Sequence, residues 1–197
     1  MDIINQGNNK TDQELVALTL ENQDYFLCII KRYKIKLFNY IRRITNIDEE
    51  EIEDLLQEIF LKAYQNLNDF DRDLKFSSWI YSIAHNQAIS HYRKTKVRPQ
   101  GNLITLEDEK VKNISADLNI EKEIDLEILN KNIFKILYNL DNKYREVLIL
   151  KFFEEKSYQE ISDIIKRPMG TVASLINRAK EEFRKELKRQ NIKLGNI

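Results

Sequence analysis

Apolar residues recur at three- and four-residue spacing along most of the chain, and this period predicts amphipathic helices. The first such segment covers residues 12–45, and the next covers residues 49–67. In the first segment the apolar face carries Leu37, Tyr40, Ile41 and Ile44. The second starts with three glutamates, which suit the N-terminal end of a helix. Its apolar stripe comprises Leu56, Phe60, Ala63, Tyr64 and Leu67.

The polar sequence NDFDRD at residues 68–73 interrupts this period and predicts a loop. A further helix should follow as far as Lys94, with Ser77 or Ser78 as its N-cap. On a helical wheel at about 100° per residue, its core side carries Ile80, Ile83 and Ala84. A different side of the same helix carries Trp79, Ser82, Asn86, Ser90 and Arg93.

Residues 98–127 lose the helical period and contain Pro99, Gly101 and scattered acidic side chains. A stretch of this length without structure is unusual inside one compact domain, so it predicts an extended acidic linker between two domains. We therefore place a first domain at residues 1–97, the linker at 98–127 and a second domain at 128–197.

The C-terminal part of the chain is again helical, with another regular apolar stripe, and a second helix should follow over residues 143–153. The stripe comprises Leu126, Leu129, Ile133, Ile136, Leu137 and Leu140. Ser157 and Glu160 have the spacing of a capping box, which predicts a short helix over residues 157–165. The turn KRPMG and a long basic helix over residues 171–189 complete a candidate helix-turn-helix, a motif whose second helix enters the major groove of DNA.

Composition agrees with helices throughout. Only four Gly and two Pro occur in 197 residues, and 42% of residues are hydrophobic, enough for packed cores. No stretch reaches the roughly 18 apolar residues of a membrane span, and the N-terminus lacks the pattern of a signal peptide. The single cysteine, Cys28, excludes an internal disulfide and fits a reducing compartment. We expect an all-α cytoplasmic protein without membrane insertion.

The net charge is zero, yet the charges are segregated along the chain. The window from Leu74 to Leu106 holds five basic residues and no carboxylate. The segment from Lys166 to Arg189 holds eight basic and three acidic residues. Two basic segments far apart in sequence predict two contact sites for one polyanion.

Trp79, the only tryptophan, lies inside the acid-free window and allows two interpretations. It is either a ring at the edge of the core or part of a surface on which unstacked bases meet an aromatic ring between cations. In the second case the amide of Asn86 would read a base edge. His85 and His91 lie on different helix faces without an accompanying acid or cysteine, so we expect no metal site.

Two long segments resemble one protein family. DLLQEIFLKAYQNLNDFDRDLKFSSWIYSIAHNQAISHYRK resembles region 2 of bacterial sigma factors of the extracytoplasmic-function (ECF) type. LDNKYREVLILKFFEEKSYQEISDIIKRPMGTVASLINRAKEEFRKEL resembles region 4 of the same family. The resemblance covers roughly residues 12–190. It implies two small helical domains joined by an extended linker, and an alternative sigma factor that binds core RNA polymerase, recognises −10 and −35 promoter elements and melts DNA.

The resemblance also implies roles for particular residues of the first domain. An exposed helix face would dock on the β′ clamp of polymerase, although a solvated acidic face is the simpler interpretation of the same residues. This face comprises Asp54, Gln57, Glu58 and Leu61. Another set would open, read or grip the −10 element, where an extruded base costs a few kcal/mol. That set comprises Lys75, Phe76, Ser77, Ser78, Trp79, Asn86, Tyr92, Arg93 and Lys94.

In the second domain, the resemblance implies that the second helix of the helix-turn-helix reads the −35 element and that the domain meets the β flap of polymerase. The implied DNA contacts are Thr171, Ala173, Ser174, Asn177, Arg178 and Lys180. Residues expected to pack instead are Val172, Leu175, Ile176 and Ala179. Phosphate contacts remain available to Lys166, Arg167, Lys180 and Arg184. The family commonly has basic residues at Ala173 and Leu175 and a glycine or asparagine near Lys166, which places the −35 preference of this chain in question.

The implied partners are core RNA polymerase, promoter DNA and an anti-sigma factor, with no cofactor and no catalytic residue. In the linker, Glu107, Asp108 and Glu109 would mimic nucleic-acid charge in the polymerase cleft, and a plain flexible tether is the alternative. Two other functions are alternatives. A helix-turn-helix regulator with a helical sensing domain leaves the tryptophan segment unexplained. A helical nuclease would need clustered carboxylates, which the acid-free window does not supply.

Overall fold

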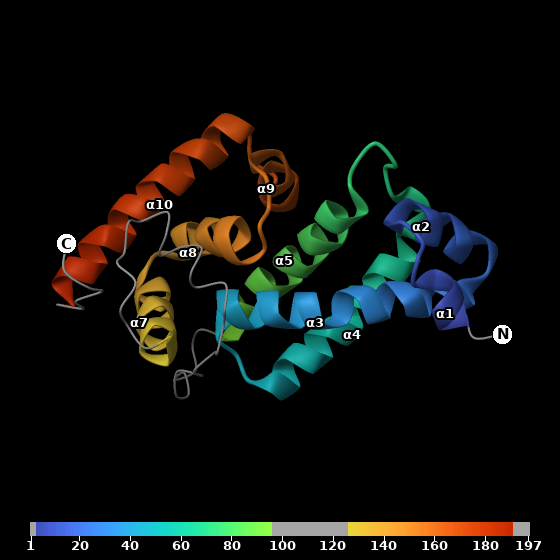
Figure 1. The fold of residues 1–197 in the computed structure, drawn as a ribbon, viewed down its shortest axis with the longest axis horizontal. Helices are drawn as coiled ribbons and strands as arrows, with labels where there is room; N and C mark the ends of the chain where they lie inside the picture. Colours follow the sequence, from blue (N-terminus) through green and yellow to red (C-terminus); the bar gives the residue numbers. More distant parts are fainter. Residues whose placement is uncertain (1–2, 96–125, 191–197) are drawn as a thin grey trace. The chain divides into compact units, whose positions relative to one another are not determined.

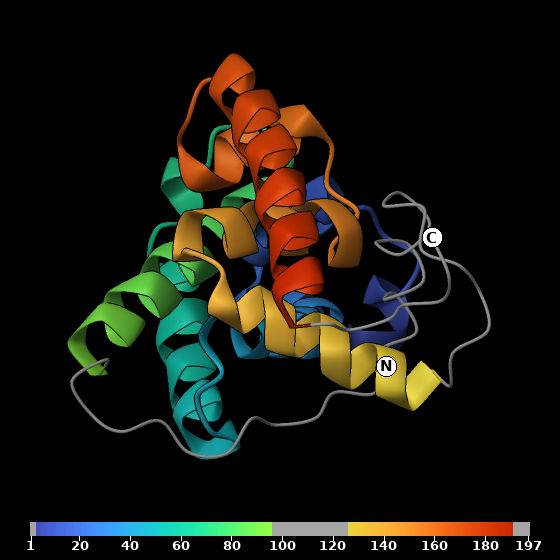
Figure 2. The same ribbon diagram turned by 90° about the vertical axis from the view of Figure 1, so that its left-hand side faces the viewer.

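The computed structural model describes residues 3–95 and 126–190, and every regular element within these ranges is helical (Figures 1 and 2). The predicted all-α fold is therefore confirmed for the described residues. The chain divides into two compact units, the first holding α1 to α5 and the second α7, α8, most of α9 and α10. The boundaries predicted at residues 97 and 128 remain predictions.

The first unit is built on three long helices that pack against one another (Figure 1). Its elements are α1 (Ile3–Gly7), α2 (Asp12–Glu21), a 3₁₀ turn (Gln23–Tyr25), α3 (Phe26–Thr45), α4 (Glu49–Gln65), a second 3₁₀ turn (Leu67–Asp69) and α5 (Phe76–Thr95). Helix α3 contacts both α4 and α5, and these two also contact each other. The short helices α1 and α2 lie at the N-terminal end of α3.

Local side-chain chemistry sets the ends of these helices. The hydroxyl of Thr11 accepts from the Glu14 amide at 3.2 Å, and the Glu14 carboxylate accepts from the Thr11 amide at 2.7 Å, so α2 begins with a capping box. The Asp48 side chain caps α4 by accepting from the Glu51 amide at 2.9 Å. Helix α3 ends at Asn46, whose left-handed backbone at φ 57° suits an asparagine.

Helix α5 starts at Phe76, one or two residues before its expected cap. The backbone amides of Ser78 and Trp79 donate to the carbonyl of Lys75, at 2.9 and 3.1 Å. Phe76 is therefore already helical, and Ser77 and Ser78 lie inside the first turn. The prediction that one of these serines is the N-cap was wrong.

The core of the first unit lies between α3, α4 and α5. The fully buried side chains there include Leu37, Tyr40, Ile41, Ile52, Ile59, Ala63, Ile80, Ala84 and Ala88. Two expected core residues differ. Tyr64 is 40% exposed near the C-terminal end of α4, and Ile83 is only half-buried.

The second unit contains α7 (Leu126–Asn139), α8 (Asn142–Leu148), which continues as a π-helical turn (Ile149–Phe153), α9 (Tyr158–Ile165) and α10 (Met169–Arg189). Helix α10 packs on α7 and α8 through Val172, Ile176, Ala179 and Phe183, all fully buried. The capping box of Ser157 and Glu160 is confirmed, with bonds of 3.2 and 3.0 Å. The predicted linker lies outside the described residues, except for its last two positions, which begin α7.

Within the described ranges, no helix combines the length and the apolar character that a membrane crossing requires.

Candidate nucleic-acid interface

An aromatic cluster stands at the start of α5. The ring of Trp79 lies 5.5 Å from the Phe76 ring and 5.2 Å from the Phe70 ring, measured between centroids. Phe70 and Phe76 meet edge to face at 5.4 Å and 88°. Both phenylalanines are buried, whereas Trp79 is half-buried. The tryptophan is thus the outermost ring of the cluster, held from two sides.

Three residues expected to contact DNA belong to the interior instead. Phe76 and Ser78 are each 1% exposed, and Tyr92 is 5% exposed. A side chain with so little accessible surface has no face left for a base or a phosphate. In the chain as folded, these three therefore support the surface from beneath, and they are not part of it.

The remaining predicted −10 residues reach solvent along one helix. Lys75, Asn86, Arg93 and Lys94 are exposed, and Ser77 is half-buried. Asn86 follows Trp79 by about two turns, and the distance along the axis from Trp79 to Arg93 is about 20 Å at 1.5 Å per residue. An aromatic ring, an amide and cations at both ends therefore share a helix whose exposed side can follow a nucleic-acid strand.

His85 lies directly beneath this surface. It is buried, and its Nδ1 lies 2.9 Å from the Tyr40 hydroxyl of α3. Burial, aided by the positive charge of Arg93, lowers the pKa of His85 to about 4, so the ring is neutral at pH 7. His85 therefore joins α5 to α3 as a core residue, a role the sequence did not indicate.

His91 points in another direction, toward α4. Its Nε2 lies 3.7 Å from the Glu51 carboxylate, so a segment without acids in sequence has one nearby in space. Across residues 3–95 and 126–190, no group of three or more His, Cys, Asp or Glu side chains is arranged to hold a metal ion.

The predicted docking face of α4 is exposed as a whole. Asp54, Gln57, Glu58 and Leu61 all reach solvent, and Leu61 is 58% exposed. The opposite face of α4 is buried against the unit. Protein interfaces combine an apolar centre with a polar rim, and Leu61 beside Asp54, Gln57 and Glu58 offers both.

Next to Leu61 the surface is hollowed between the C-terminal end of α4 and the start of α3. The hollow has a volume of about 440 Å³ and a largely apolar lining. It is lined by Gln23, Asp24, Phe26, Leu27, Ile30, Phe60, Leu61 and Tyr64. Leu27 is 54% exposed at its edge. Sequence patterns missed this feature because its two walls are more than thirty residues apart.

The helix-turn-helix of the second unit consists of α9, a turn and α10. Lys166 ends α9 in the left-handed region at φ 53°, and the Ser162 hydroxyl donates to the Arg167 carbonyl at 2.5 Å. Of the predicted −35 contacts, those that are exposed near the start of α10 are Thr171, Ser174, Asn177 and Arg178. The expected packing of Val172, Ile176 and Ala179 is confirmed, whereas Leu175 is half-buried.

Two predicted −35 contacts are less open. Ala173 is half-buried, and the Lys180 ammonium lies 5.5 Å from the centroid of the Phe152 ring. A cation over a ring is partly held by it, so Lys180 has less freedom to reach a phosphate than a fully exposed lysine. Met169, at the first position of α10, is 52% exposed and was not predicted as part of this surface.

The chain matches two family descriptions that together cover more than half of it. Residues 29–98 match Sigma-70 region 2, and residues 132–183 match Sigma-70, region 4. The chain is similar to the ECF RNA polymerase sigma factor SigW of Bacillus subtilis (strain 168), with 37% identity over 172 residues, 85% of this chain and 91% of the relative. It is also similar to the ECF RNA polymerase sigma-E factor of Escherichia coli (strain K12), with 31% identity over 176 residues, 87% and 91% of the two chains.

Two solved structures share the fold. CnrH in complex with the cytosolic domain of CnrY matches with a TM-score of 0.66 and 24% identity, over 90% of this chain and 97% of that chain. The sigma factor RpoE in complex with the anti-sigma factor NepR from Bartonella quintana matches with a TM-score of 0.62 and 20% identity, over 83% and 96%.

Proposed function

The chain belongs to the extracytoplasmic-function family of RNA polymerase sigma factors, and on this premise we propose that separate surfaces of its two units carry separate steps of initiation. It is an alternative sigma factor, which binds core RNA polymerase, recognises −10 and −35 promoter elements and promotes DNA melting. The alternative of a helix-turn-helix regulator accounts only for the second unit and leaves the match of residues 29–98 unexplained.

The promoter is opened at the exposed side of α5. The observation that carries this assignment is the half-buried Trp79, fixed by Phe70 and Phe76 at the head of a surface that also presents Asn86, Arg93 and Lys94. A base leaving the duplex loses its stacking partners, and stacking on an aromatic side chain returns about 1–3 kcal/mol per base. Cations along the same helix hold the phosphates of the released strand.

Core polymerase docks on the exposed face of α4. Asp54, Gln57 and Glu58 supply acceptors and a donor, while Leu61 supplies apolar area. We assign the β′ clamp to this face and the β flap to the second unit. This division leaves the side of α5 that carries Trp79 available to DNA within the holoenzyme.

The −35 element is read by the start of α10. Thr171, Ser174, Asn177 and Arg178 present hydrogen-bonding groups there, with Arg178 suited to guanine and Asn177 to adenine. Lys166, Arg167 and Arg184 are exposed and contribute phosphate contacts, which add affinity without sequence preference. Ala173 offers only apolar contact, so it discriminates less among bases than a basic residue would.

The chain supplies no catalytic group of its own, because polymerase forms the bonds, and it works in the cytoplasm. An anti-sigma factor is a further proposed partner. The structural relatives RpoE and CnrH were solved in complexes, the first with the anti-sigma factor NepR and the second with the cytosolic domain of CnrY. A comparable protein would hold the present chain inactive by covering its polymerase-binding surfaces.

Transcription with purified components tests this assignment. Core polymerase with the full chain should give transcripts whose start sites share upstream −10 and −35 elements, and core polymerase alone should not. The full chain without polymerase should bind the same duplex only weakly. Tight, specific duplex binding by the chain alone, together with no promoter-dependent transcript, would contradict the proposal.

A further inference from the structure

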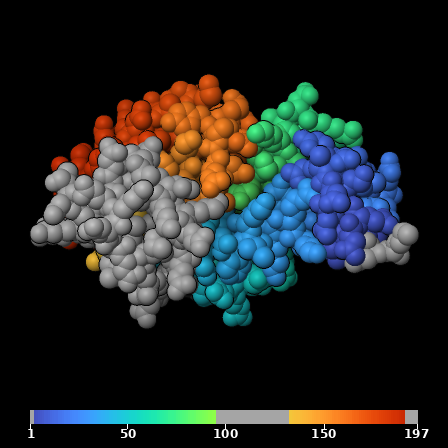
Figure 3. All heavy atoms as spheres, viewed as in Figure 1, coloured from blue at the N-terminus to red at the C-terminus, as the bar shows by residue number. Residues whose placement is uncertain are grey.

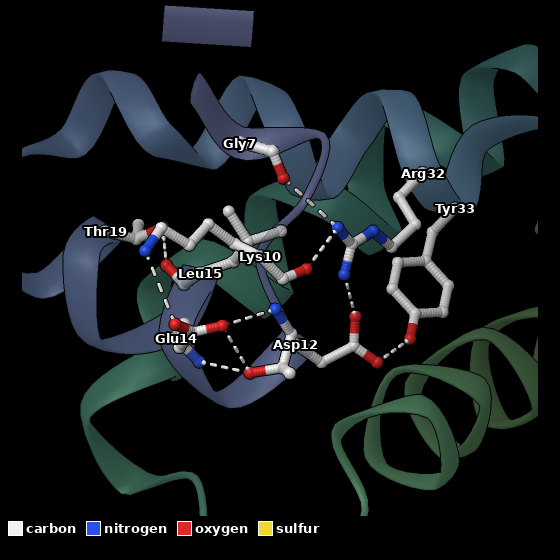
Figure 4. A network of polar contacts seen from close by, with 9 residues as sticks. Gly7, Lys10, Asp12, Glu14, Leu15, Thr19, Arg32 and Tyr33 are labelled. Carbon is white, nitrogen blue, oxygen red and sulfur yellow. Dashed lines mark hydrogen bonds and ion pairs between the residues drawn. The ribbon is translucent and has the colours of Figure 1, made fainter. Parts of the chain in front are cut away.

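The carboxylate of Asp12 joins the start of α2 to two neighbouring residues of α3 (Figure 4). One oxygen accepts from the Arg32 guanidinium at 2.7 Å, and the other accepts from the Tyr33 hydroxyl at 2.5 Å. Both carboxylate oxygens therefore accept a hydrogen bond. We call the contact of Asp12 with Arg32 the arginine branch and the contact of Asp12 with Tyr33 the tyrosine branch.

The arginine branch stays within the N-terminal segment. The second terminal nitrogen of Arg32 donates to the carbonyls of Lys10 and Gly7, at 2.7 and 3.3 Å (Figure 4). Arg32 and Asp12 keep 25% and 24% of their side-chain surface exposed. This branch fastens the turn between α1 and α2 onto α3, and none of its contacts reaches α5.

The tyrosine branch leads into the aromatic cluster. Tyr33 is 4% exposed, and its ring meets the Phe76 ring edge to face, with centroids 5.7 Å apart and planes at 68°. Burial and the neighbouring Asp12 carboxylate raise the pKa of the Tyr33 hydroxyl, which keeps it a donor to Asp12 at all working pH values. One end of this ring is therefore fixed by a charge-assisted bond, and its side presses on Phe76.

Phe76 connects Tyr33 to the half-buried ring of Trp79. It is 1% exposed and lies 5.5 Å from Trp79, so its position limits where the tryptophan can lie. Figure 3 shows the N-terminal helices in contact with the start of α5 and the loop before it, and α2 and α5 are in contact in the structure. The path from Asp12 to Trp79 thus runs through two packed rings.

We propose that Asp12 and Tyr33 are positioning residues for the DNA-opening surface, acting on Trp79 through Phe76. The proposal rests on the function assigned above to Trp79. A ring stacks on a base most effectively when it is ordered before the base arrives. The entropy lost in ordering the ring then does not add to the free-energy barrier of DNA opening. The tyrosine branch orders the Trp79 ring through buried residues that do not themselves contact DNA.

The main test replaces the ring. Tyr33→Leu removes the edge contact with Phe76, so Phe76 and Trp79 gain freedom. Because Trp79 is the only tryptophan, its fluorescence reports on the cluster directly. We expect greater quenching of Trp79 by acrylamide in the free protein. In the holoenzyme we expect promoter opening to slow roughly tenfold, since small misplacements of a working group have effects of this size or larger. Affinity for core polymerase should not change.

Two milder variants and one matched control complete the design. Tyr33→Phe keeps the ring and loses the bond to Asp12, and Asp12→Asn weakens the same bond. Each should slow opening by roughly threefold, as the loss of one hydrogen bond predicts, with a smaller rise in quenching. Arg32→Gln breaks the arginine branch alone. It should lower thermal stability while leaving Trp79 quenching and the opening rate unchanged.

Two results would overturn the inference. The first is that Tyr33→Phe and Asp12→Asn both show the Trp79 quenching and the promoter-opening rate of the wild type. This result would contradict the inference even if Tyr33→Leu does not fold. The other is an Arg32→Gln variant that matches the tyrosine variants in both readouts, because the whole contact would then be a structural clasp. A different result would contradict the role assigned to Trp79 itself, namely a Trp79→Ala variant that opens the promoter at the wild-type rate.

Discussion

At the scale of single residues, the proposed opening surface depends on buried side chains beneath it. Trp79 is half-buried, and Phe70 and Phe76 contact its ring from the interior and restrict its position. Burying two phenylalanines to orient one tryptophan also contributes to stability, since each such ring removes a large apolar area from water. The same contacts therefore serve folding and function.

The buried His85 predicts a pH dependence of folding. Its pKa is lowered from an ordinary 6.5 to about 4 in the folded chain, so between these values the unfolded chain binds more protons. The contribution of His85 to the free energy of unfolding should therefore be fully present above pH 6.5. It should fall by up to about 3 kcal/mol as the pH drops toward 4. Urea unfolding, followed through Trp79 fluorescence at several pH values, measures this loss.

His85→Gln isolates the effect, because carboxylates also titrate on the acid side. The variant should be less stable at pH 7, where the contact with Tyr40 is lost or altered, but its stability should fall less steeply between pH 6.5 and 4. His91→Gln replaces the other histidine of the chain and is the matched control. An equal slope in all three proteins would show that His85 is charged in the folded chain.

Residue-level burial was only partly predictable. The helical wheel placed Ile80 and Ala84 in the core correctly, but it placed Ser82, which is buried, on the same side as Trp79 and Asn86. A wheel assumes one buried face, whereas α5 contacts α2, α3 and α4 and is therefore buried over much of its circumference. Which side of such a helix remains open depends on its neighbours and not on its own period.

At the scale of elements, the turn between α9 and α10 carries a strained residue. Lys166 adopts φ 53°, where a side chain costs about 1 kcal/mol or more and glycine costs little. Lys166→Gly should therefore raise the stability of the second unit by about 1 kcal/mol. Thermal unfolding of the full chain, monitored by circular dichroism, measures the change.

Arg167→Gly is the matched control for this prediction. It removes the same charge from the same turn, but Arg167 is not among the described residues with positive φ. Glycine there only adds freedom to the unfolded chain, so this variant should lose stability. A loss of stability in Lys166→Gly as large as that in Arg167→Gly would mean that the left-handed turn is not strained.

The elements themselves were largely predictable. Capping chemistry identified the start of α9, and the apolar period identified α4 and its exposed face. The hollow beside Leu61 was not predictable, because Leu27 and Ile30 come from α3 and meet α4 only in the folded unit. The contact between Asp12 and Tyr33 was not predictable for the same reason, because it joins residues of two different helices.

At the scale of the whole molecule, we propose that polymerase binding and DNA opening belong to different helices. In this proposal α4 carries the docking face, α5 the opening surface and α10 the residues that read the −35 element. The two basic segments of the sequence predict two DNA contacts, one in each unit. The charge pattern could not predict the contacts that connect Asp12 to Trp79, because it contains no information on which aromatic rings pack beneath a surface.

The rate of promoter opening, measured beside the affinity for core polymerase, tests this separation most directly. A 2-aminopurine reporter in the −10 element gives the opening rate of the holoenzyme. Trp79→Ala and Asn86→Ala should slow opening, Trp79→Ala by roughly tenfold or more, as the loss of one stacked base predicts, at unchanged polymerase affinity. Asp54→Ala should weaken polymerase binding and leave opening by the assembled complex unchanged. Lost polymerase affinity in Trp79→Ala, with normal opening once assembled, would contradict the account.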